Sequence, residues 1–495
     1  MSQAAALGNK VWNLASVLRD QGLSYGDYLE QITLLLFLKM AHERETIAGE
    51  NTGIPSDCNW QSLMDNIDAG AELTSHYVQL LSTLSNRPGL LGLIFKDAQN
   101  RITTPVLFRR VVNLINEHIW LSLESDVKGD LYEGLLERNA QDVKSGAGQY
   151  FTPRPLIDAI VDVMQPSLGQ TVADPACGTG GFLLAVYQYL ADPKRVKDMS
   201  DEQDTLLRER TFYGVDIVPG VVRLCAMNLY LHGLEMPDDD TPLIDNRDAL
   251  AQEPDTLYDM VLTNPPFGRK SSITIVDAAG NVTREQETIS RAGFVTTSNK
   301  QLNFVQHVIS MLKPHGSAAV VVPDNVLFEG GAGEKVRKDL LKTCDVHTLL
   351  RLPTGIFYAQ GVKANVLFFD RKPGRSEPWT DHLWVYDFRT NINFTLKTNP
   401  LKREDLNDFV TCYCPGARHE RQESERFHCF SYDDLTARDK TNLDIFWLKD
   451  ASLEESANLP APEVLASSII EDLEAALEAF REIAEELDGS ASALL

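Results

Sequence analysis

The sequence predicts an α/β protein in which a doubly wound sheet lies between an all-α N-terminal domain and a helical C-terminal tail. Residues from about 142 to 372 alternate short apolar strands with amphipathic helices, whereas the flanking parts show helical spacing of apolar residues. A glycine-rich turn also follows one of the strands. Ligands of a doubly wound sheet bind at the carboxyl ends of its strands, so this turn marks the expected site.

The expected organisation has four parts. An all-α domain covers residues 1–140, the α/β domain residues 141–400, a mixed region residues 401–459 and a C-terminal helix residues 460–495. Apolar side chains of the first part recur every three or four residues, as they do on helices that pack into a core. They include Trp12, Leu14, Val17, Leu18, Tyr28, Ile32, Leu35, Leu36, Phe37, Val111, Leu114, Ile115 and Ile119.

Acidic residues and glycines mark the ends of the first strands. Asp174 and Asp216 each end an apolar stretch, and Asp248 precedes the strand Met260–Leu262. A carboxylate at Asp216 could accept both hydroxyls of a ribose and Asp248 could accept from an adenine amine, although each acid alone also suits a turn. The glycines after Asp174 permit a tight turn and close approach of a ligand to the backbone. The turn residues are Gly178, Thr179, Gly180 and Gly181.

The strand Met260–Leu262 leads into the tetrapeptide Asn264, Pro265, Pro266 and Phe267. An Asn amide can accept a hydrogen bond from an exocyclic amine, and the prolines fix the backbone so that the Pro265 carbonyl points to the same place. The Phe267 ring can stack on a flat base. Together these groups would hold a planar amine, although Asn and Pro alone also form ordinary turns.

With these motifs the chain resembles the modification (M) subunit of type I restriction-modification systems, which is an N6-adenine DNA methyltransferase. The resemblance covers nearly the whole chain and is weakest from about 401 to 439. Further matching segments are Gly148–Leu156, Val320–Phe328 and Leu350–Phe357. The resemblance implies a Rossmann-like methyltransferase sheet in residues 141–400, with S-adenosylmethionine as the cofactor. The cofactor-binding residues that the resemblance implies are Gln149, Tyr150, Phe151, Thr152, Pro153, Arg154, Thr179, Gly180, Gly181 and Asp216. The strand-end pattern adds Asp174, Gly178 and Asp248 to the expected cofactor site.

The chemistry that the resemblance implies is direct methyl transfer to N6 of adenine, with Asn264, Pro265, Pro266 and Phe267 as the catalytic residues. Such a reaction mainly needs positioning and hydrogen-bond acceptors, so no covalent intermediate and no metal are expected. Bonds from the adenine amine to the Asn264 side-chain oxygen and the Pro265 carbonyl would return the lone pair to the nitrogen. The target lies inside duplex DNA, so the base must be flipped out.

The strong negative charge suggests that the protein binds DNA together with partners. A net charge of −25 opposes autonomous duplex binding, because phosphate contacts require Lys and Arg. The resemblance implies a separate specificity (S) subunit that reads the sequence, a second M subunit joined through it, and restriction (R) subunits. Methylation would then protect host DNA from cleavage. A few basic residues near the tetrapeptide could contact phosphates or be solvated: Arg269, Lys270, Arg284, Arg291 and Lys300.

The C-terminal segment predicts a helix from about 463 to 487 that has one narrow apolar stripe and an acidic remainder. The stripe consists of Ile469, Leu473, Leu477, Phe480, Ala484 and Leu487. The family suggests that this helix packs on the S subunit, whereas folding back onto its own domain would use the same stripe.

Cysteine content and hydropathy point to the cytoplasm. Seven cysteines without a C-x-x-C pair fit a reducing compartment. The apolar run 32–38 is too short to span a bilayer, and no secretory signal is visible. A zinc site is not expected because the spacing of the nearest cluster does not match. That cluster comprises Cys412, Cys414, His419, His428 and Cys429.

Two other functions remain open on the sequence alone. An Asn-Pro-Pro-aromatic motif also serves methyltransferases that act on protein glutamine or RNA. The long helical N-terminal domain and the acidic tail argue against that alternative. A catalytically silent scaffold is the second, and the intact tetrapeptide argues against it.

Overall fold

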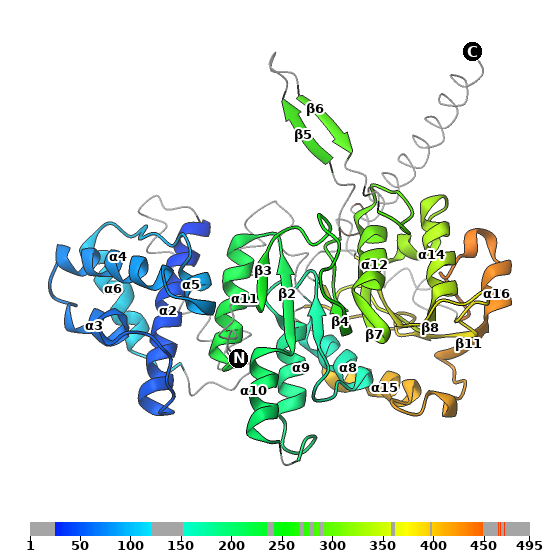
Figure 1. Cartoon of the computed structure of the whole chain (residues 1–495), viewed down its shortest axis with the longest axis horizontal. Helices are drawn as coiled ribbons and strands as arrows, with labels where there is room; N and C mark the ends of the chain where they lie inside the picture. Colours follow the sequence, from blue (N-terminus) through cyan, green and yellow to red (C-terminus); the bar gives the residue numbers. More distant parts are fainter. Residues whose placement is uncertain are drawn as a thin grey trace.

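The computed structural model describes residues 25–120, 152–197, 199–234, 242–267, 272–276, 282–286, 289, 291–357, 362–396 and 398–448, with 464, 466 and 470. Gln149, Tyr150 and Phe151 therefore lie outside the described residues, as does nearly all of the expected C-terminal helix. A helical N-terminal part packs beside an α/β part that is built on one large sheet (Figure 1).

The described N-terminal part consists of helices only. They are α2 (Tyr25–Ile47), the short 3-10 turn η1 (Ser56–Cys58), α3 (Trp60–Asp65), α4 (Ala71–Ser85), α5 (Gly89–Phe95) and α6 (Pro105–Asn116). Their apolar faces meet in a core, in which the rings of Tyr77 and Phe108 lie 4.8 Å apart. The expected face of α6 holds Val111 and Ile115, which are buried, but Ile119 lies beyond the end of the helix and is 59% exposed. Assigning Ile119 to the apolar face was wrong because the helix ends at Asn116.

The sheet has nine strands in the order β11-β10-β8-β9-β7-β4-β1-β2-β3. The strands are β1 (Val172–Asp174), β2 (Phe212–Asp216), β3 (Ile244–Asn246), β4 (Tyr258–Thr263), β7 (Leu312–Pro323), β8 (Cys344–Arg351), β9 (Ala364–Arg371), β10 (His382–Asp387) and β11 (Phe427–Ser431). Strands β3, β2, β1, β4 and β7 run parallel to one another, as expected for a doubly wound sheet. The sheet as a whole is mixed, because β9 runs antiparallel to β7 and β8, and β11 antiparallel to β10.

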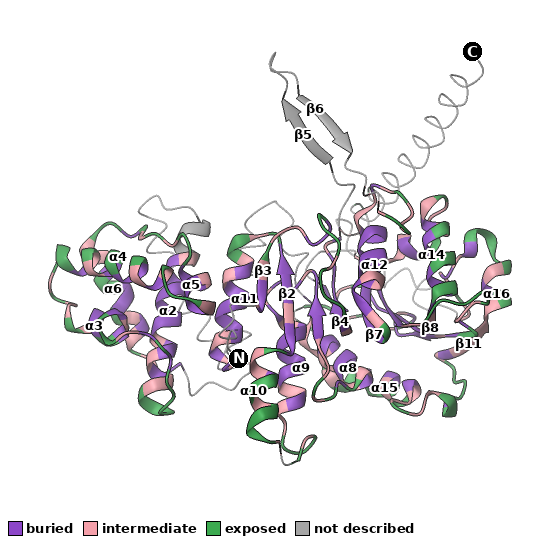
Figure 2. Cartoon of the chain, viewed as in Figure 1, coloured by how far each residue is buried: buried purple, intermediate pink, exposed green. Residues whose placement is uncertain are grey.

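Helices pack on both faces of the sheet, whose strands are mostly buried (Figure 2). In β4, Met260 and Leu262 face the same core as α8, α9 and α11, whereas Val261 joins the core of α12 and α14. The helices of this part are α8 (Arg154–Met164), α9 (Gly181–Ala191), α10 (Asp201–Glu209), α11 (Pro219–Leu231), α12 (Lys300–Met311), α13 (Asp324–Phe328), α14 (Ala332–Thr343), α15 (Asn407–Tyr413) and α16 (Tyr432–Ala437), with the short 3-10 turns η3 (Arg403–Leu406), η4 (Arg418–Glu420) and η5 (Asp439–Thr441).

The helical N-terminal part is attached to the sheet through α11. The Arg44 guanidinium donates to the carbonyl of Tyr230, and the ring of Phe37 lies 5.2 Å from that of Tyr230. Arg223 of α11 pairs with Glu30 of α2 and donates to the carbonyl of Lys96 at 2.8 Å. These contacts place the N-terminal helices beside the β3 edge of the sheet (Figure 1).

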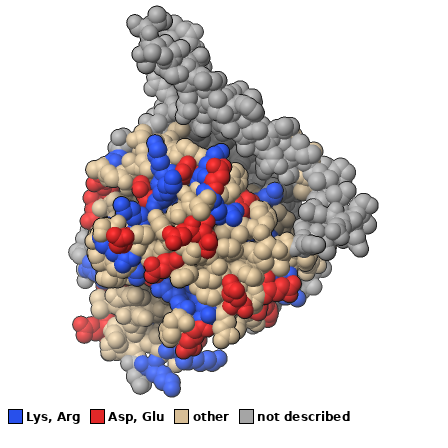
Figure 3. Space-filling view, turned by 90° about the vertical axis from the view of Figure 1, so that its right-hand side faces the viewer, with Lys and Arg blue, Asp and Glu red and all other residues tan. Residues whose placement is uncertain are grey.

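A two-stranded hairpin, β5 (Ser272–Val276) and β6 (Val282–Gln286), projects from the body shortly after β4 (Figure 1). Its strands pair with each other in a separate sheet. The face around α14 and α16 mixes acidic and basic side chains (Figure 3). The described residues of that face therefore form no single-sign patch in this view.

Candidate active site

The strand order brings the predicted site residues together at the carboxyl ends of neighbouring parallel strands. Strand β1 lies between β2 and β4, where the strand order reverses, and Val172 pairs with both Phe212 and Met260. Because these strands are parallel, their carboxyl ends lie at the same edge. Asp174 ends β1, Asp216 ends β2 and Asn264 directly follows β4. The expectation that residues far apart in sequence meet here rests on this parallel order.

The glycine turn joins β1 to α9. Gly178 and Gly180 both have positive φ angles, 54° and 84°. The N–H of Gly180 donates to the carbonyl of Cys177 at 2.8 Å, which closes the turn. A Cβ on Gly180 would lie 2.8 Å from the sulfur of Cys225, so this position requires glycine for space as well as for its backbone conformation.

Cys177 lies inside the turn as a buried filler. Its thiol contacts Cys225, and that contact together with burial raises the pKa of Cys177 well above its ordinary value. A thiol with a raised pKa carries little thiolate at neutral pH, and thiolate is the nucleophilic form. Cys177 therefore fills space in the turn.

The two strand-end acids are buried and bonded to the backbone. Asp216 accepts the N–H of Gly178 at 3.2 Å and that of Val218 at 2.9 Å. Asp174 accepts the N–H of Ala176 at 3.0 Å. Burial raises the pKa of Asp216 and raises that of Asp174 to about 7. Both acids are thus held in one orientation by backbone N–H groups, in surroundings that disfavour the charged form of the carboxyl.

Asp248 has a different environment from the other two acids. It lies two residues beyond β3, is half-buried and accepts the N–H of Leu250 at 2.9 Å. The neighbouring N–H of Arg247 donates to the carbonyl of Asp216 at 3.2 Å. This bond brings the turn at Asp248 beside the end of β2.

The tetrapeptide after β4 presents one unsatisfied acceptor. The Asn264 side chain is 7% exposed, and its Nδ2 donates to the hydroxyl of Thr152 at 2.9 Å. Its Oδ1 is buried and has no hydrogen-bond partner within the described residues. A buried amide oxygen without a partner is costly, so this oxygen is the atom of the tetrapeptide that is ready to accept a bond from a ligand.

Phe267 lies against a second aromatic residue. Its ring packs edge-on against that of Phe357, with ring centres 5.9 Å apart and an angle of 86° between the planes. Both side chains are largely buried. This contact fixes the orientation of the Phe267 ring. The partnership of Phe357 with Phe267 was not expected from the sequence, because no local pattern links residues so far apart.

The segment before α8 connects the turn with the tetrapeptide. Thr152 bonds to Asn264, Pro153 precedes the first residue of α8, and the Arg154 guanidinium donates to the carbonyl of Gly181 at 3.0 Å. Thr179 of the turn is held from the other side, since Nδ2 of Asn228 donates to its carbonyl at 3.0 Å. Three of the six residues expected in this segment are therefore seen at the site.

Two residues near the site, Ile217 and Arg291, have surroundings that the sequence did not predict. Ile217, directly after Asp216, is 59% exposed, which is unusual for an apolar residue at the end of a buried strand. Arg291, which was expected near phosphates or solvent, instead donates to the carbonyl of Leu250 and contacts His307. Its guanidinium therefore fastens the segment before α12 to the turn after β3.

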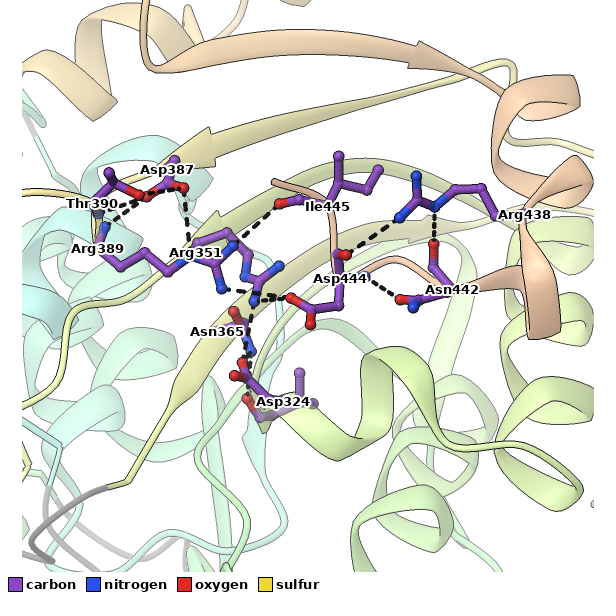
Figure 4. Close-up of polar contacts among 11 residues, drawn as sticks. Asp324, Arg351, Asn365, Asp387, Arg389, Thr390, Arg438, Asn442, Asp444 and Ile445 are labelled. Atoms are coloured by element: carbon purple, nitrogen blue, oxygen red, sulfur yellow. Dashed lines mark hydrogen bonds and ion pairs between the residues drawn. The ribbon is translucent and has the colours of Figure 1, made fainter. Parts of the chain in front are cut away.

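A second polar cluster lies at the same edge, at the carboxyl ends of β7, β8 and β10 (Figure 4). The fully buried side chain of Arg351 pairs with Asp324 at 3.3 Å and with Asp444. Arg389 pairs with Asp444 at 3.5 Å, and its guanidinium lies 3.9 Å from the ring centre of Phe446. Each guanidinium is matched by a carboxylate, so the cluster holds the segment after η5 against the sheet.

Within the described part of the chain, no group of three or more His, Cys, Asp and Glu side chains could hold a metal ion. The helices of that part include none long and apolar enough to cross a membrane.

Comparison with known proteins gives matches over nearly the whole chain. The family model described as N-6 DNA Methylase matches residues 123–446, and the one described as HsdM N-terminal domain matches residues 7–115. The StySPI type I restriction enzyme methylase subunit of Salmonella potsdam is 38% identical, with 94% of this chain and 92% of that protein aligned. The EcoKI methylase subunit of Escherichia coli is 37% identical over 97% and 95% of the two chains.

A solved structure from a study of complex assembly in the type I restriction-modification system has the same fold. Its TM-score is 0.66 at 26% sequence identity, and the alignment covers 99% of each chain.

Proposed function

The chain belongs to the N-6 DNA methylase family and is a type I restriction-modification methylase subunit with adenine-specific DNA methyltransferase activity; from this premise we propose how it works. It transfers a methyl group from S-adenosylmethionine to N6 of an adenine that has been flipped out of duplex DNA. The observation that carries this proposal is the buried Oδ1 of Asn264 at the carboxyl end of β4, which has no hydrogen-bond partner among the residues that the structure describes.

The residues at the ends of β1 and β2 fit S-adenosylmethionine. Asp216 offers a carboxylate that is already oriented by two backbone N–H groups, and the exposed Ile217 beside it offers an apolar surface for a purine ring. The glycine turn, Asp174 and the segment at Thr152–Arg154 would hold the rest of the molecule. When bound, S-adenosylmethionine supplies an electrophilic methyl group.

The tetrapeptide would orient the nucleophile. Asn264 Oδ1 and the Pro265 carbonyl would accept the two hydrogens of the adenine amine, which draws that nitrogen toward tetrahedral geometry and frees its lone pair. The Asn264 amide is already held by Thr152 before the base arrives, so little reorganisation is needed during the reaction. Phe267, held by Phe357, would stack on the extruded base.

Partner subunits would supply most of the basic residues for DNA binding, because this chain is strongly acidic. At a net charge of −25, we propose that a separate specificity subunit provides most of the phosphate contacts and reads the DNA sequence. The names of the relatives, which call them methylase subunits of type I restriction enzymes, support a role beside other subunits. A second M subunit would join through the specificity subunit, restriction subunits would complete the nuclease, and methylation would protect host DNA.

The test is a methyl-transfer assay with the full chain, prepared with and without its specificity subunit. Radiolabelled S-adenosylmethionine is offered with duplex DNA, RNA and protein, and methyladenine positions are mapped by sequencing. We expect label in DNA only, at N6 of one adenine in a defined sequence, and dependent on the specificity subunit. Label in protein glutamine or in RNA would favour the alternative substrate classes instead.

The matched control for this assay is Asn264→Ala. It removes the proposed acceptor and leaves the glycine turn and the strand-end acids in place. We expect turnover to fall by at least about 100-fold, the usual effect of removing one preorganised polar group from an active site. Turnover that survives this change would refute the role of Asn264.

A further inference from the structure

Thr152 lies beside the tetrapeptide and shares a buried hydrogen bond with it. Its hydroxyl receives the N–H of Asn264 at 2.9 Å, and both side chains are 7% exposed. The two residues are 112 positions apart in the chain. Because water has little access to this pair, the bond fixes the position of the Asn264 amide against the segment before α8.

The bond matters because packing alone orients a terminal amide poorly. The last torsion of an Asn side chain is broad and roughly two-fold, so oxygen and nitrogen can exchange places at little steric cost. With Nδ2 bonded to Thr152, the oxygen is the end of the amide that finds no partner in the described part of the chain. An acceptor in that position suits an amine ligand, whereas the reversed amide would present a donor to it.

Thr152 is itself held rigidly. The carbonyl of Pro153 accepts the N–H groups of Leu156 and Ile157 at 3.0 and 3.1 Å, which fixes the segment to the first turn of α8. Arg154 adds the bond to the carbonyl of Gly181. The hydroxyl therefore has a fixed position relative to both the glycine turn and β4.

We propose that Thr152 is a positioning residue for methyl transfer, whose hydrogen bond holds the Asn264 side chain in the place from which Oδ1 faces the amine of the target base. This inference rests on the proposed function of Asn264 and adds a role for a residue outside the tetrapeptide. It differs from the role that the family resemblance implies for Thr152, which is cofactor binding. The two roles predict different kinetics.

The test compares Thr152→Val with Thr152→Ser in the full chain assembled with its specificity subunit. Valine keeps the shape of the side chain but offers no acceptor, so one N–H of Asn264 loses its partner and the amide can turn. Serine keeps the hydroxyl. We expect kcat of Thr152→Val to fall about 10- to 100-fold, as is typical when a supporting hydrogen bond to an active-site group is removed. Thr152→Ser should keep kcat within about threefold of wild type.

The dissociation constant of S-adenosylmethionine, measured by titration calorimetry, separates the two roles. We expect both variants to bind it within about threefold of wild type, because the change acts on the amide rather than on the cofactor. A Thr152→Val protein with wild-type kcat would overturn the inference, as would one whose cofactor affinity falls in step with its activity. A Thr152→Ser protein that is as slow as Thr152→Val would do so too.

Two further measurements keep the result interpretable. Asn264→Ala in the same assay tests the proposed function by itself, since an active Asn264→Ala protein refutes that function whatever Thr152 does. The midpoint of thermal unfolding shows whether each variant is folded. If Thr152→Val does not fold, Thr152→Ala is measured in its place. The kcat of Thr152→Ser should then exceed that of Thr152→Ala, because serine retains the hydroxyl.

Discussion

The carboxylate of Asp216 accepts the backbone N–H of Gly178 at 3.2 Å, so the end of β2 is bonded to the glycine turn that follows β1. The same side chain accepts the N–H of Val218 and thereby shapes the start of α11. These bonds keep the carboxylate in one orientation at the point where the strand order reverses.

We therefore expect Asp216→Ala to weaken binding of S-adenosylmethionine about 10- to 100-fold, because hydrogen bonds to charged groups contribute about 1.5–3 kcal/mol each. Titration calorimetry on the full chain measures this affinity. Asp204→Ala, which removes an acid from the partly exposed Arg208 pair on α10, serves as the control and should bind as wild type does. Equal affinity in the two variants would mean that Asp216 does not contact the cofactor.

The sequence predicted the strand-end residues well because their signals are local. Asp174, Asp216 and Asn264 each follow an apolar run, and in parallel strands such positions share one edge of the sheet. Strand direction has no comparable local signal. The antiparallel direction of β9 therefore could not be recognised, since a buried antiparallel strand and a buried parallel strand show the same run of apolar residues.

Contacts between residues far apart in the chain could not be predicted from the sequence either. The bond from Asn264 to Thr152 and the packing of Phe267 on Phe357 both join residues that meet only after the sheet has formed. Residue type gave no hint either, because a Thr before a helix is an ordinary N-terminal residue. Such pairs require the three-dimensional arrangement of the strands.

The stability of the protein should depend on pH through Asp174. Burial raises the pKa of this carboxyl from 3.8 to about 7, so the folded chain binds the proton more tightly than the unfolded chain does. The contribution of Asp174 to the free energy of unfolding is therefore most favourable below about pH 4 and is lost as the pH rises to about 7. At about 1.4 kcal/mol per pKa unit, the loss is at most about 4 kcal/mol.

Asp174→Asn removes this titration. We expect the midpoint temperature of the variant, relative to wild type, to rise by a few degrees between pH 5 and pH 8. Thermal unfolding of both proteins in the same buffers measures the difference. A difference that is constant across this range would show that Asp174 does not carry the pH dependence.

Gly180 is constrained both by its positive φ angle and by the close approach of Cys225, and comparison with Gly169 separates the two effects. Its φ is +84° and an added Cβ would lie 2.8 Å from the Cys225 sulfur, whereas Gly169 has a φ of +87° and open space around it. Gly169→Ala should therefore cost only backbone strain, about 1 kcal/mol, and Gly180→Ala about 1–3 kcal/mol more. Thermal unfolding ranks the variants. Cys225→Ala in the Gly180→Ala background should recover part of the loss, and a double variant as unstable as the single one would contradict the steric explanation.

The pair formed by Arg351 and Asp444 should stabilise the segment that follows η5. The Arg351 side chain is fully buried, so removing its carboxylate partner leaves a charge that water cannot reach. Breaking a buried pair commonly costs 3–5 kcal/mol, but Asp324 remains as a second partner at 3.3 Å, so we expect Asp444→Ala to cost about 2 kcal/mol.

The control for this last prediction is Glu334→Gln, which removes the partly exposed partner of the exposed Lys338 on α14 and should leave the unfolding midpoint unchanged. Limited proteolysis adds a local measurement, because loss of Asp444 releases the segment while the sheet stays intact. Faster cleavage between residues 438 and 447 in Asp444→Ala is therefore expected. If the midpoint and the cleavage rate both matched wild type, Arg351 would be satisfied by Asp324 alone, and Asp444 would have no part in holding the segment.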